Sequence, residues 1–194
     1  AYDDTADTFT EITSFSTEFS FQINGNTNGA DGLTFTLQND AAGSDALGLA
    51  GFGMGVDGVT PSFAIAFDTW DNTGGVAPGA SDINLYVNGD ALNPIVSVAS
   101  PFDLNAGTQL YAKVDYKPTS KLLDVFISNT NTFGATPTVS TIVTDLGDNP
   151  GGQAFSGFTA ATGGASNEHK ILEWSGLSTT HTVPTFDGIE IDLN

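Results

Sequence analysis

The sequence predicts an all-β protein built as a two-sheet antiparallel β-sandwich. Apolar and polar residues alternate with a period of two in many short stretches, and turn sequences such as Asn88-Gly89-Asp90 separate these stretches. No segment keeps a 3.6-residue apolar period with capping signals at both ends. Period-two alternation is typical of half-buried antiparallel strands, and many strands at short spacing favour a sandwich.

Each predicted strand is recognised by the apolar residues on one of its faces, while the residues between them are polar. In chain order these faces are Phe19, Phe21 and Ile23; Leu33, Phe35 and Leu37; Phe63, Ile65 and Phe67; Ile83, Leu85 and Val87; Leu110, Ala112 and Val114; and Leu123, Val125 and Ile127. The tail from Phe186 to Leu193 alternates in the same way and predicts one more strand.

The chain is expected to form one domain over residues 1–194, because all-β domains reach this size undivided. The glycine-rich stretch Gly48–Gly58 lies between two strong strands, so we interpret it as a loop within the domain and not as a linker. A long glycine-containing loop inside a compact domain is often functional.

The charge balance excludes some partners. The chain has 23 Asp and Glu residues against four lysines and no arginine, for a formal net charge of −19. Without a basic patch, nucleic-acid or phosphate binding is not expected, and contact with an anionic membrane is disfavoured. Such acidity fits calcium binding, a saline environment or simple solubility, and the charge pattern does not separate these.

Two absences narrow the class further. The chain has no cysteine, which removes disulfides, thiolate metal sites and cysteine nucleophiles together. No apolar run approaches the roughly 20 residues of a membrane helix, so no membrane insertion is expected. The acidic start at Ala1 is what a processed secreted protein, or a trimmed fragment, would show.

The stretch from Phe63 to Asn72 has two interpretations. An alternating apolar strand ends in Asp68, Asp71 and Asn72, with Trp70 among them. Carboxylate, carbonyl and amide oxygens in one loop can hold a hard cation, and a neighbouring aromatic ring offers a surface for a sugar ring. The same residues also suit an Asx turn at an ordinary strand end. From this stretch alone, both interpretations stay open.

Several motifs follow one another along the chain. They are Gly29–Phe35, Ala64–Asn72, Asp82–Asn88, Leu110–Tyr116, Leu123–Ile127, Gly157–Gly163 and His169–Ser175. Each is weakly specific alone, but the ordered set, which covers roughly Phe15 to Trp174, resembles the legume lectins and their bacterial relatives, the L-type lectin domains. The resemblance implies a concanavalin A-like jelly roll with a sugar site at the rim of its concave sheet.

The resemblance also implies which residues bind sugar. Asp31 would accept hydrogen bonds from sugar hydroxyls and would follow a cis peptide bond, Asn72 would bind the same sugar, and Trp70 would stack on its ring. Asp45 falls near the backbone-donor position of a glycine-rich loop, and Ala165 lies in the last, short specificity loop. A turn role for Asp31 and rim packing for Trp70 are the alternatives.

The same resemblance implies a calcium site. Its ligands would be Asp68, the backbone carbonyl of Trp70, the Asn72 side chain and, as a further carboxylate, Asp82 or Asp71. The family's first metal-binding acid is replaced here by Ala66, on the same strand face as Asp68, and Asp82 stands in place of a histidine. Since imidazole favours manganese-like ions, calcium is the expected cofactor and manganese is disfavoured. A degenerate site without calcium is the alternative.

No catalytic constellation is apparent. Retaining glycosidases need two carboxylates on one strand face, and the only Glu-x-Asp pair of that kind is Glu190-Ile191-Asp192, near the end of the chain. No Ser/His/Asp set or histidine-rich zinc set is found. We therefore expect a non-enzymatic, calcium-dependent carbohydrate-binding domain of a secreted or cell-surface protein. Its partners would be glycans or polysaccharide, in adhesion or glycan recognition.

The main alternative is a structural, self-assembling matrix or filament subunit that keeps the lectin scaffold without sugar binding. Members of the family usually begin with one or two strands that this chain lacks, which predicts an exposed sheet edge. Residues 175–194 are expected to form a C-terminal extension that adds a strand, within the chain or to a neighbouring subunit. A homo-oligomer through edge strands would follow from the second arrangement.

Overall fold

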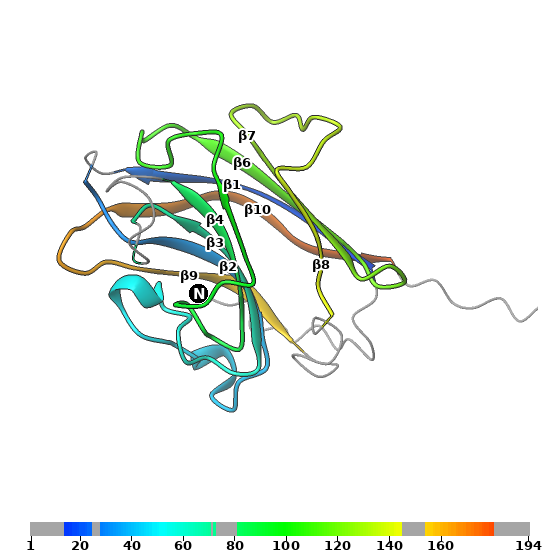
Figure 1. The fold of residues 1–194 in the computed structure, drawn as a ribbon, viewed down its shortest axis with the longest axis horizontal. Helices are drawn as coiled ribbons and strands as arrows, with labels where there is room; N and C mark the ends of the chain where they lie inside the picture. The colour runs from blue at the N-terminus through cyan, green and yellow to red at the C-terminus, as the bar shows by residue number, and fades with distance from the viewer. Residues whose placement is uncertain (1–13, 25–27, 71, 73–80, 145–153, 181–194) are drawn as a thin grey trace, which may run out of the picture.

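The computed structural model describes residues 14–24, 28–70, 72, 81–144 and 154–180, which form two antiparallel sheets packed face to face (Figure 1). The back sheet has the strand order β10-β1-β6-β7-β8, and the front sheet has the order β5-β4-β3-β2-β9. The strands are β1 (Ser14–Asn24), β2 (Gly32–Gln38), β3 (Ser62–Asp68), β4 (Asp82–Val87), β5 (Val96–Ala99), β6 (Leu110–Lys117), β7 (Leu122–Ser128), β8 (Val139–Ile142), β9 (Phe155–Ala161) and β10 (Glu168–Thr180). The predicted fold class is confirmed.

Six of these strands, β1–β4, β6 and β7, correspond to the apolar alternations in the sequence. Strands β5 and β8 are only four residues long, which is too short for alternation to stand out. The first part of the expected C-terminal extension, residues 175–180, continues β10, where Leu177 pairs with Thr17 of β1. The strand expected at Phe186–Leu193 lies outside the described residues.

Aromatic rings join the two sheets in the main core. Phe67 of β3 lies 4.6 Å from Phe21 of β1, measured between ring centroids, and meets Phe19 edge-on at 5.8 Å. At the β9–β10 side, the rings of Phe158 and Trp174 are 5.1 Å apart. Such tilted and edge-on contacts add to the stability that comes from burying apolar area. The core therefore holds the front sheet in a defined position, with its other face turned outward.

A second, smaller apolar cluster lies on that outward face of the front sheet. Residues 39–61, here called the cover loop, fold over the sheet and include the 3-10 turns η1 (Gly43–Asp45) and η2 (Gly51–Gly53) (Figure 1). The cluster consists of Ala46, Met54, Val56, Val59, Ala64, Ala66, Tyr86 and Ala91. Ala64 and Ala66 leave room for the apolar residues of the loop, so the loop is anchored by a core of its own.

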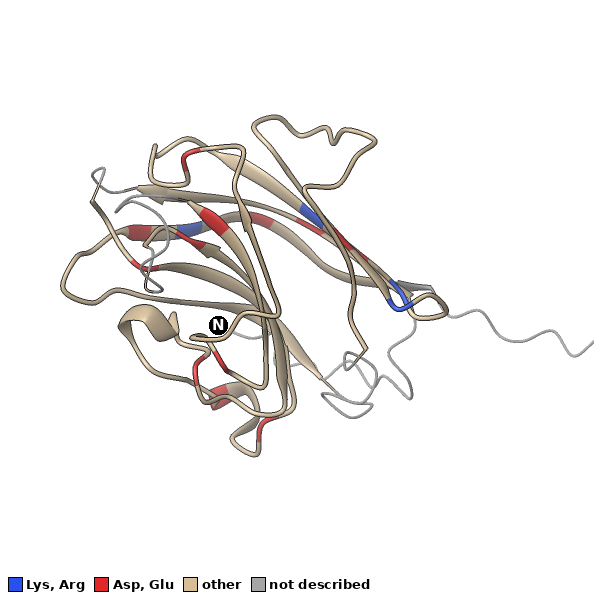
Figure 2. Cartoon of the chain, in the orientation of Figure 1, with Lys and Arg blue, Asp and Glu red and all other residues tan. Residues whose placement is uncertain are grey.

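The positive charges are confined to one side of the sandwich. The four lysines lie on β6, on β10 and in the turn between β6 and β7, all belonging to the back sheet (Figure 2). The strands of the front sheet and the cover loop contain no lysine or arginine. The front face is therefore acidic without local compensation.

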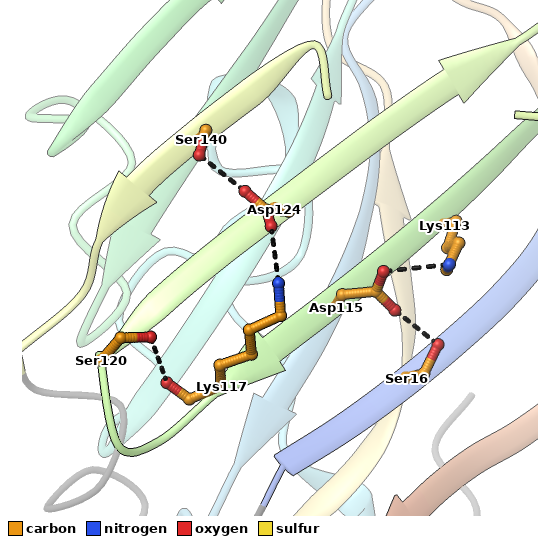
Figure 3. Close-up of polar contacts among 7 residues, drawn as sticks. All are labelled: Ser16, Lys113, Asp115, Lys117, Ser120, Asp124 and Ser140. Atoms are coloured by element: carbon orange, nitrogen blue, oxygen red, sulfur yellow. Dashed lines mark hydrogen bonds and ion pairs between the residues drawn. The ribbon is translucent and has the colours of Figure 1, made fainter. Parts of the chain in front are cut away.

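The back sheet carries its own polar network on its outer face (Figure 3). Ser140 Oγ donates to Asp124 Oδ1 at 2.6 Å, and Lys117 Nζ lies 3.5 Å from the other oxygen of the same carboxylate. Asp124 is thus a buried carboxylate with two donors.

Among the described residues no helix is long and apolar enough to cross a membrane.

Candidate functional site

Four of the five predicted sugar-binding residues line one pocket on the outward side of the front sheet. Asp31, Trp70, Asn72 and Ala165 surround a volume of about 400 Å³, within the usual range of about 300–1,000 Å³ for small-molecule sites. The other lining residues are Ala30, Gly51, Phe52, Gly163 and Gly164. The pocket therefore lies where the cover loop and the loop after β9 meet.

Asp31 is held at the base of this pocket by its backbone. Its N–H donates to the carbonyl of Ala161 at 3.1 Å, and its own carbonyl accepts from the N–H of Thr69 at 2.9 Å. The Ala30–Asp31 peptide bond is cis, as the resemblance implied. The residue is only 5% exposed, and its Oδ2 atom has no hydrogen-bond partner among the described residues. Burial raises the pKa of this carboxyl above its usual value.

Two glycines lie against the unpaired oxygen of Asp31. A Cβ atom at Gly163 would sit 3.3 Å from Asp31 Oδ2, and one at Gly51 would sit 3.9 Å from it. The Gly51 N–H donates to the carbonyl of Thr162 at 3.3 Å, which links the cover loop to the loop after β9. A side chain at position 163 would crowd this oxygen, and one at position 51 would take up space beside it, so the two glycines leave room for a ligand hydroxyl.

A buried amide network supports the chain before Asp31. The Asn105 side chain donates to the carbonyls of Gly29 (3.4 Å) and Thr69 (3.5 Å), and the Asn167 amide donates to Asn105 Oδ1 at 2.7 Å. Turned over, the Asn167 amide would instead accept from the N–H of Ala30 at 3.2 Å. In either orientation Asn167 ties the loop after β9 to the segment that carries Asp31.

Gly29→Ala should disrupt this network, because a Cβ at position 29 would overlap Oδ1 of Asn167. We expect a loss of about 1–3 kcal/mol in the free energy of unfolding, the usual cost of overpacking. Chemical denaturation measures it. The double variant Gly29→Ala/Asn167→Ala should recover part of the loss, because the clashing amide is gone. Equal instability of the single and double variants would contradict the clash.

The residues predicted to bind metal line a second, smaller cavity next to the pocket around Asp31. Asp68, Asn72 and Asp82 border a volume of about 80 Å³, together with Asn84, Tyr86, Ala91, Pro94 and Ser97. Asn72 lines both spaces, so a ligand of a bound cation would also face the pocket around Asp31. The Trp70 carbonyl accepts from the Asn72 amide nitrogen at 3.0 Å, so these two predicted metal-binding groups lie next to each other.

Asp68 is a buried carboxylate in an acidic neighbourhood. Its Oδ1 accepts from the Trp70 N–H at 2.8 Å and its Oδ2 from the Asn84 amide at 3.1 Å. Burial, with repulsion from Asp82 and Asp31, outweighs these two hydrogen bonds and raises the pKa of Asp68 to about 7. A cation next to Asp68 would stabilise the charged carboxylate and so offset the cost of burying its charge.

The donor set suits a hard cation. The lining residues of the small cavity offer carboxylate, amide, hydroxyl and backbone oxygens, and neither histidine nor cysteine is among them. The Oδ1 atom of Asn84 is buried without a hydrogen-bond partner in the described part of the chain. Oxygen ligands of this kind suit calcium. Within the described residues, no three His, Asp or Glu side chains group closely enough to hold a metal by themselves. Asp71, the other carboxylate considered, lies outside them.

Asp45 is not brought together with the other sugar-site residues. It lines a separate pocket of about 270 Å³, bordered by Ser44, Leu47 and residues 158–160. After η1 the cover loop turns back on itself, with the Gly48 N–H donating to the Gly55 carbonyl at 2.8 Å. This turn brings Gly51 and Phe52 to the pocket around Asp31 instead. Sequence reasoning missed both, although they lie within the glycine-rich stretch predicted to be functional.

A larger groove of about 560 Å³ lies on the back sheet, between β1, β6, β10 and the segment after β7. Glu18, Tyr111, Phe133 and Trp174 are among its lining residues. None of the predicted sugar or metal residues is part of this groove, so its size does not identify it as the functional site.

Comparisons with known proteins agree with this geometry. The legume lectin domain model matches residues 3–188. The chain is 34% identical over 180 residues to the probable L-type lectin-domain containing receptor kinase S.7 of Arabidopsis thaliana, covering 84% of this chain and 26% of the kinase, about a quarter of its length.

Solved lectin structures are similar as well. The basic winged bean lectin with Tn-antigen is 29% identical, with a TM-score of 0.69, over 84% of this chain and 70% of that one. The lectin from Bauhinia forficata in complex with GalNAc is 25% identical, also with a TM-score of 0.69, over 87% and 74% of the two chains. The chain therefore belongs to the legume lectin domain family, a family of non-enzymatic carbohydrate-binding domains.

Proposed function

We propose that this domain binds the terminal sugar of a glycan in the pocket formed by Asp31, Trp70, Asn72 and Ala165, and that calcium in the neighbouring cavity supports this binding. The observation that carries the proposal is the buried, unpaired Oδ2 atom of Asp31 in a pocket of sugar size. A buried acceptor without a partner is costly, and a ligand hydroxyl would satisfy it.

Each lining residue has a role in this proposal. The half-buried Trp70 offers an aromatic surface to the C–H face of the sugar ring, and Phe52 offers a second apolar surface from the cover loop. The Asn72 side chain supplies a polar group at the mouth, while Ala165 is too small to obstruct it. Calcium would be held by Asp68, the Trp70 carbonyl, Asn72 and Asp82, with water completing its shell.

The charge distribution favours a neutral sugar. No lysine or arginine lies on the front sheet or the cover loop. Asp31 lines the pocket, and Asp68 and Asp82 line the neighbouring cavity. A sialic acid or uronic acid would therefore bring a further negative charge close to these carboxylates. GalNAc, the sugar named with the Bauhinia forficata lectin, is a neutral ligand with which to start.

Glycan-array binding with calcium and with a chelator tests the proposal. We expect binding to neutral glycans in calcium, with at least about tenfold weaker binding after chelation because Asn72 and Trp70 lose their cation. Anionic glycans should bind less well than their neutral counterparts. An array without binding in either condition would exclude sugar recognition and would favour a structural role for the scaffold.

The wider setting is also part of the proposal. Extracellular placement, in a secreted or cell-surface protein that recognises glycans or adheres to them, agrees with the lectin domain of a receptor kinase as a relative. Edge strands β8 and β10 of the back sheet, and β5 and β9 of the front sheet, are where a second subunit would add strands. Light scattering of the whole chain and of a chain without residues 186–194 measures whether such an oligomer exists.

A further inference from the structure

The front sheet carries an unusual polar ladder on its outward face. Across β3 and β4, Asp68 pairs with Asp82, Ala66 with Asn84, and Ala64 with Tyr86. Paired residues in adjacent strands point to the same face. Strand β3 therefore contributes one carboxylate and two methyl groups to this face, and the apolar residues of the cover loop pack over Ala64 and Ala66.

Asn84 stands opposite Ala66 in the neighbouring strand and contacts Asp68 directly. Its amide nitrogen donates to Asp68 Oδ2 at 3.1 Å and also lies 3.3 Å from the Tyr86 hydroxyl. Since the Trp70 N–H holds the other oxygen, both carboxylate oxygens of Asp68 have a donor. Each oxygen keeps a second acceptor position free for a cation.

Packing alone does not account for an asparagine at this position. The Asn84 side chain is 6% exposed, and its Oδ1 atom has no partner among the described residues. An apolar side chain of the same volume would avoid a buried, unpaired carbonyl. The amide is retained next to a carboxylate in a cavity lined by oxygen atoms, which points to a role toward a cation there.

We infer that Asn84 is the positioning residue of the cation site: it orients the Asp68 carboxylate, so that one calcium ion binds without a second metal ion. The inference rests on the calcium site proposed above. A ligand held by a hydrogen bond before the cation arrives needs no neighbouring metal to orient it. Asn84 on β4, opposite Ala66 of β3, thus supplies the hydrogen bond that holds the Asp68 carboxylate.

The test compares calcium affinity in three proteins by isothermal titration calorimetry. Asn84→Leu keeps the volume but removes the donor, and we expect calcium to bind about 10–100-fold more weakly. Gln38→Met removes another buried amide of the front sheet, one that donates to the Gly43 carbonyl at 2.8 Å. It should lower the unfolding midpoint but leave calcium affinity unchanged, since Gln38 does not line the cavity.

Manganese provides the second readout, because it tests whether calcium binds at this site without a second metal ion. The calcium affinity of the wild type should be the same with and without added manganese. Asn84→Leu with wild-type calcium affinity, or a wild type that needs manganese to bind calcium, would overturn the inference while leaving the proposed function intact. A wild type that binds no calcium would overturn both the calcium site and the role of Asn84.

Discussion

Asp31→Asn should weaken sugar binding by about 10–100-fold or more without destabilising the protein. The asparagine has the same shape but no charge, and hydrogen bonds to a charged acceptor contribute about 1.5–3 kcal/mol. Because every 1.4 kcal/mol is about tenfold in affinity, the expected loss follows directly. Calorimetric titration with the best neutral sugar from the array measures it.

The stability of Asp31→Asn should stay the same or rise, although its affinity for sugar falls. The carboxylate is buried with an unpaired oxygen, and its raised pKa shows that the fold disfavours its charge. The neutral amide should therefore keep or raise the unfolding midpoint, which separates loss of binding from loss of structure. Asp45→Asn is the matched control, because Asp45 lines another pocket. This variant should bind sugar as well as the wild type does. An equal loss in both variants would mean that the pocket around Asp31 is not the sugar site.

Asp68→Asn should abolish calcium-induced stabilisation and, in the absence of calcium, make the protein more stable at neutral pH and above. The pKa of Asp68 is about 7 in the folded protein against 3.8 for the free group. At about 1.4 kcal/mol for each pKa unit, ionising this group costs the metal-free fold on the order of 4 kcal/mol. The variant does not bear that cost, but it also lacks the carboxylate that calcium needs.

The same shift gives a pH dependence with a defined sign. With its folded-state pKa raised, Asp68 binds its proton more tightly in the folded than in the unfolded chain. In chelator, the free energy of unfolding should therefore fall as pH rises from about 4 to about 7, and level off above. Asp68→Asn should flatten this slope. Calcium at 100 times its dissociation constant should raise the free energy of unfolding of the wild type by about 2.7 kcal/mol.

Asp124→Asn is the control for this experiment. Asp124 is another buried carboxylate, but Ser140 and Lys117 already contact it on the back sheet. Its loss should not stabilise the protein, and the calcium response should remain. Thermal and urea unfolding of the three proteins, each in calcium and in chelator across pH 4–9, measure all of these effects. A wild-type slope that persists in Asp68→Asn would assign it to another group.

Much of the sandwich could be predicted because its signal is local. The alternation of Phe63, Ile65 and Phe67 is visible in one strand, and the structure buries all three residues in the main core. The shared face of Ala66 and Asp68 follows from the same period. The proximity of Asp31 to Trp70 and Asn72 came from the ordered motifs, since these residues lie about 40 positions apart in the chain.

The contacts that the sequence did not predict depend on pairing between distant segments. Asn84 meets Asp68 only because of the register of β3 with β4, and a shift of one residue would turn Asn84 to the other face. Asn105 and Asn167 meet although 62 positions separate them. Gly51 and Phe52 replaced Asp45 at the pocket because the cover loop reverses direction, a feature set by its backbone hydrogen bonds.

The cover loop gives this lectin domain a practical route to new specificity. Met54, Val56 and Val59 attach the loop to the front sheet, while Phe52 reaches the pocket from the preceding turn. Phe52 also packs against the edge of the anchoring cluster, so it belongs to both the pocket lining and the anchor, whereas Met54, Val56 and Val59 belong to the anchor alone. A library randomised at Phe52 and Ala165 would sample many pocket shapes while Met54, Val56 and Val59 keep the buried part of the anchor, so selection could act mainly on ligand choice.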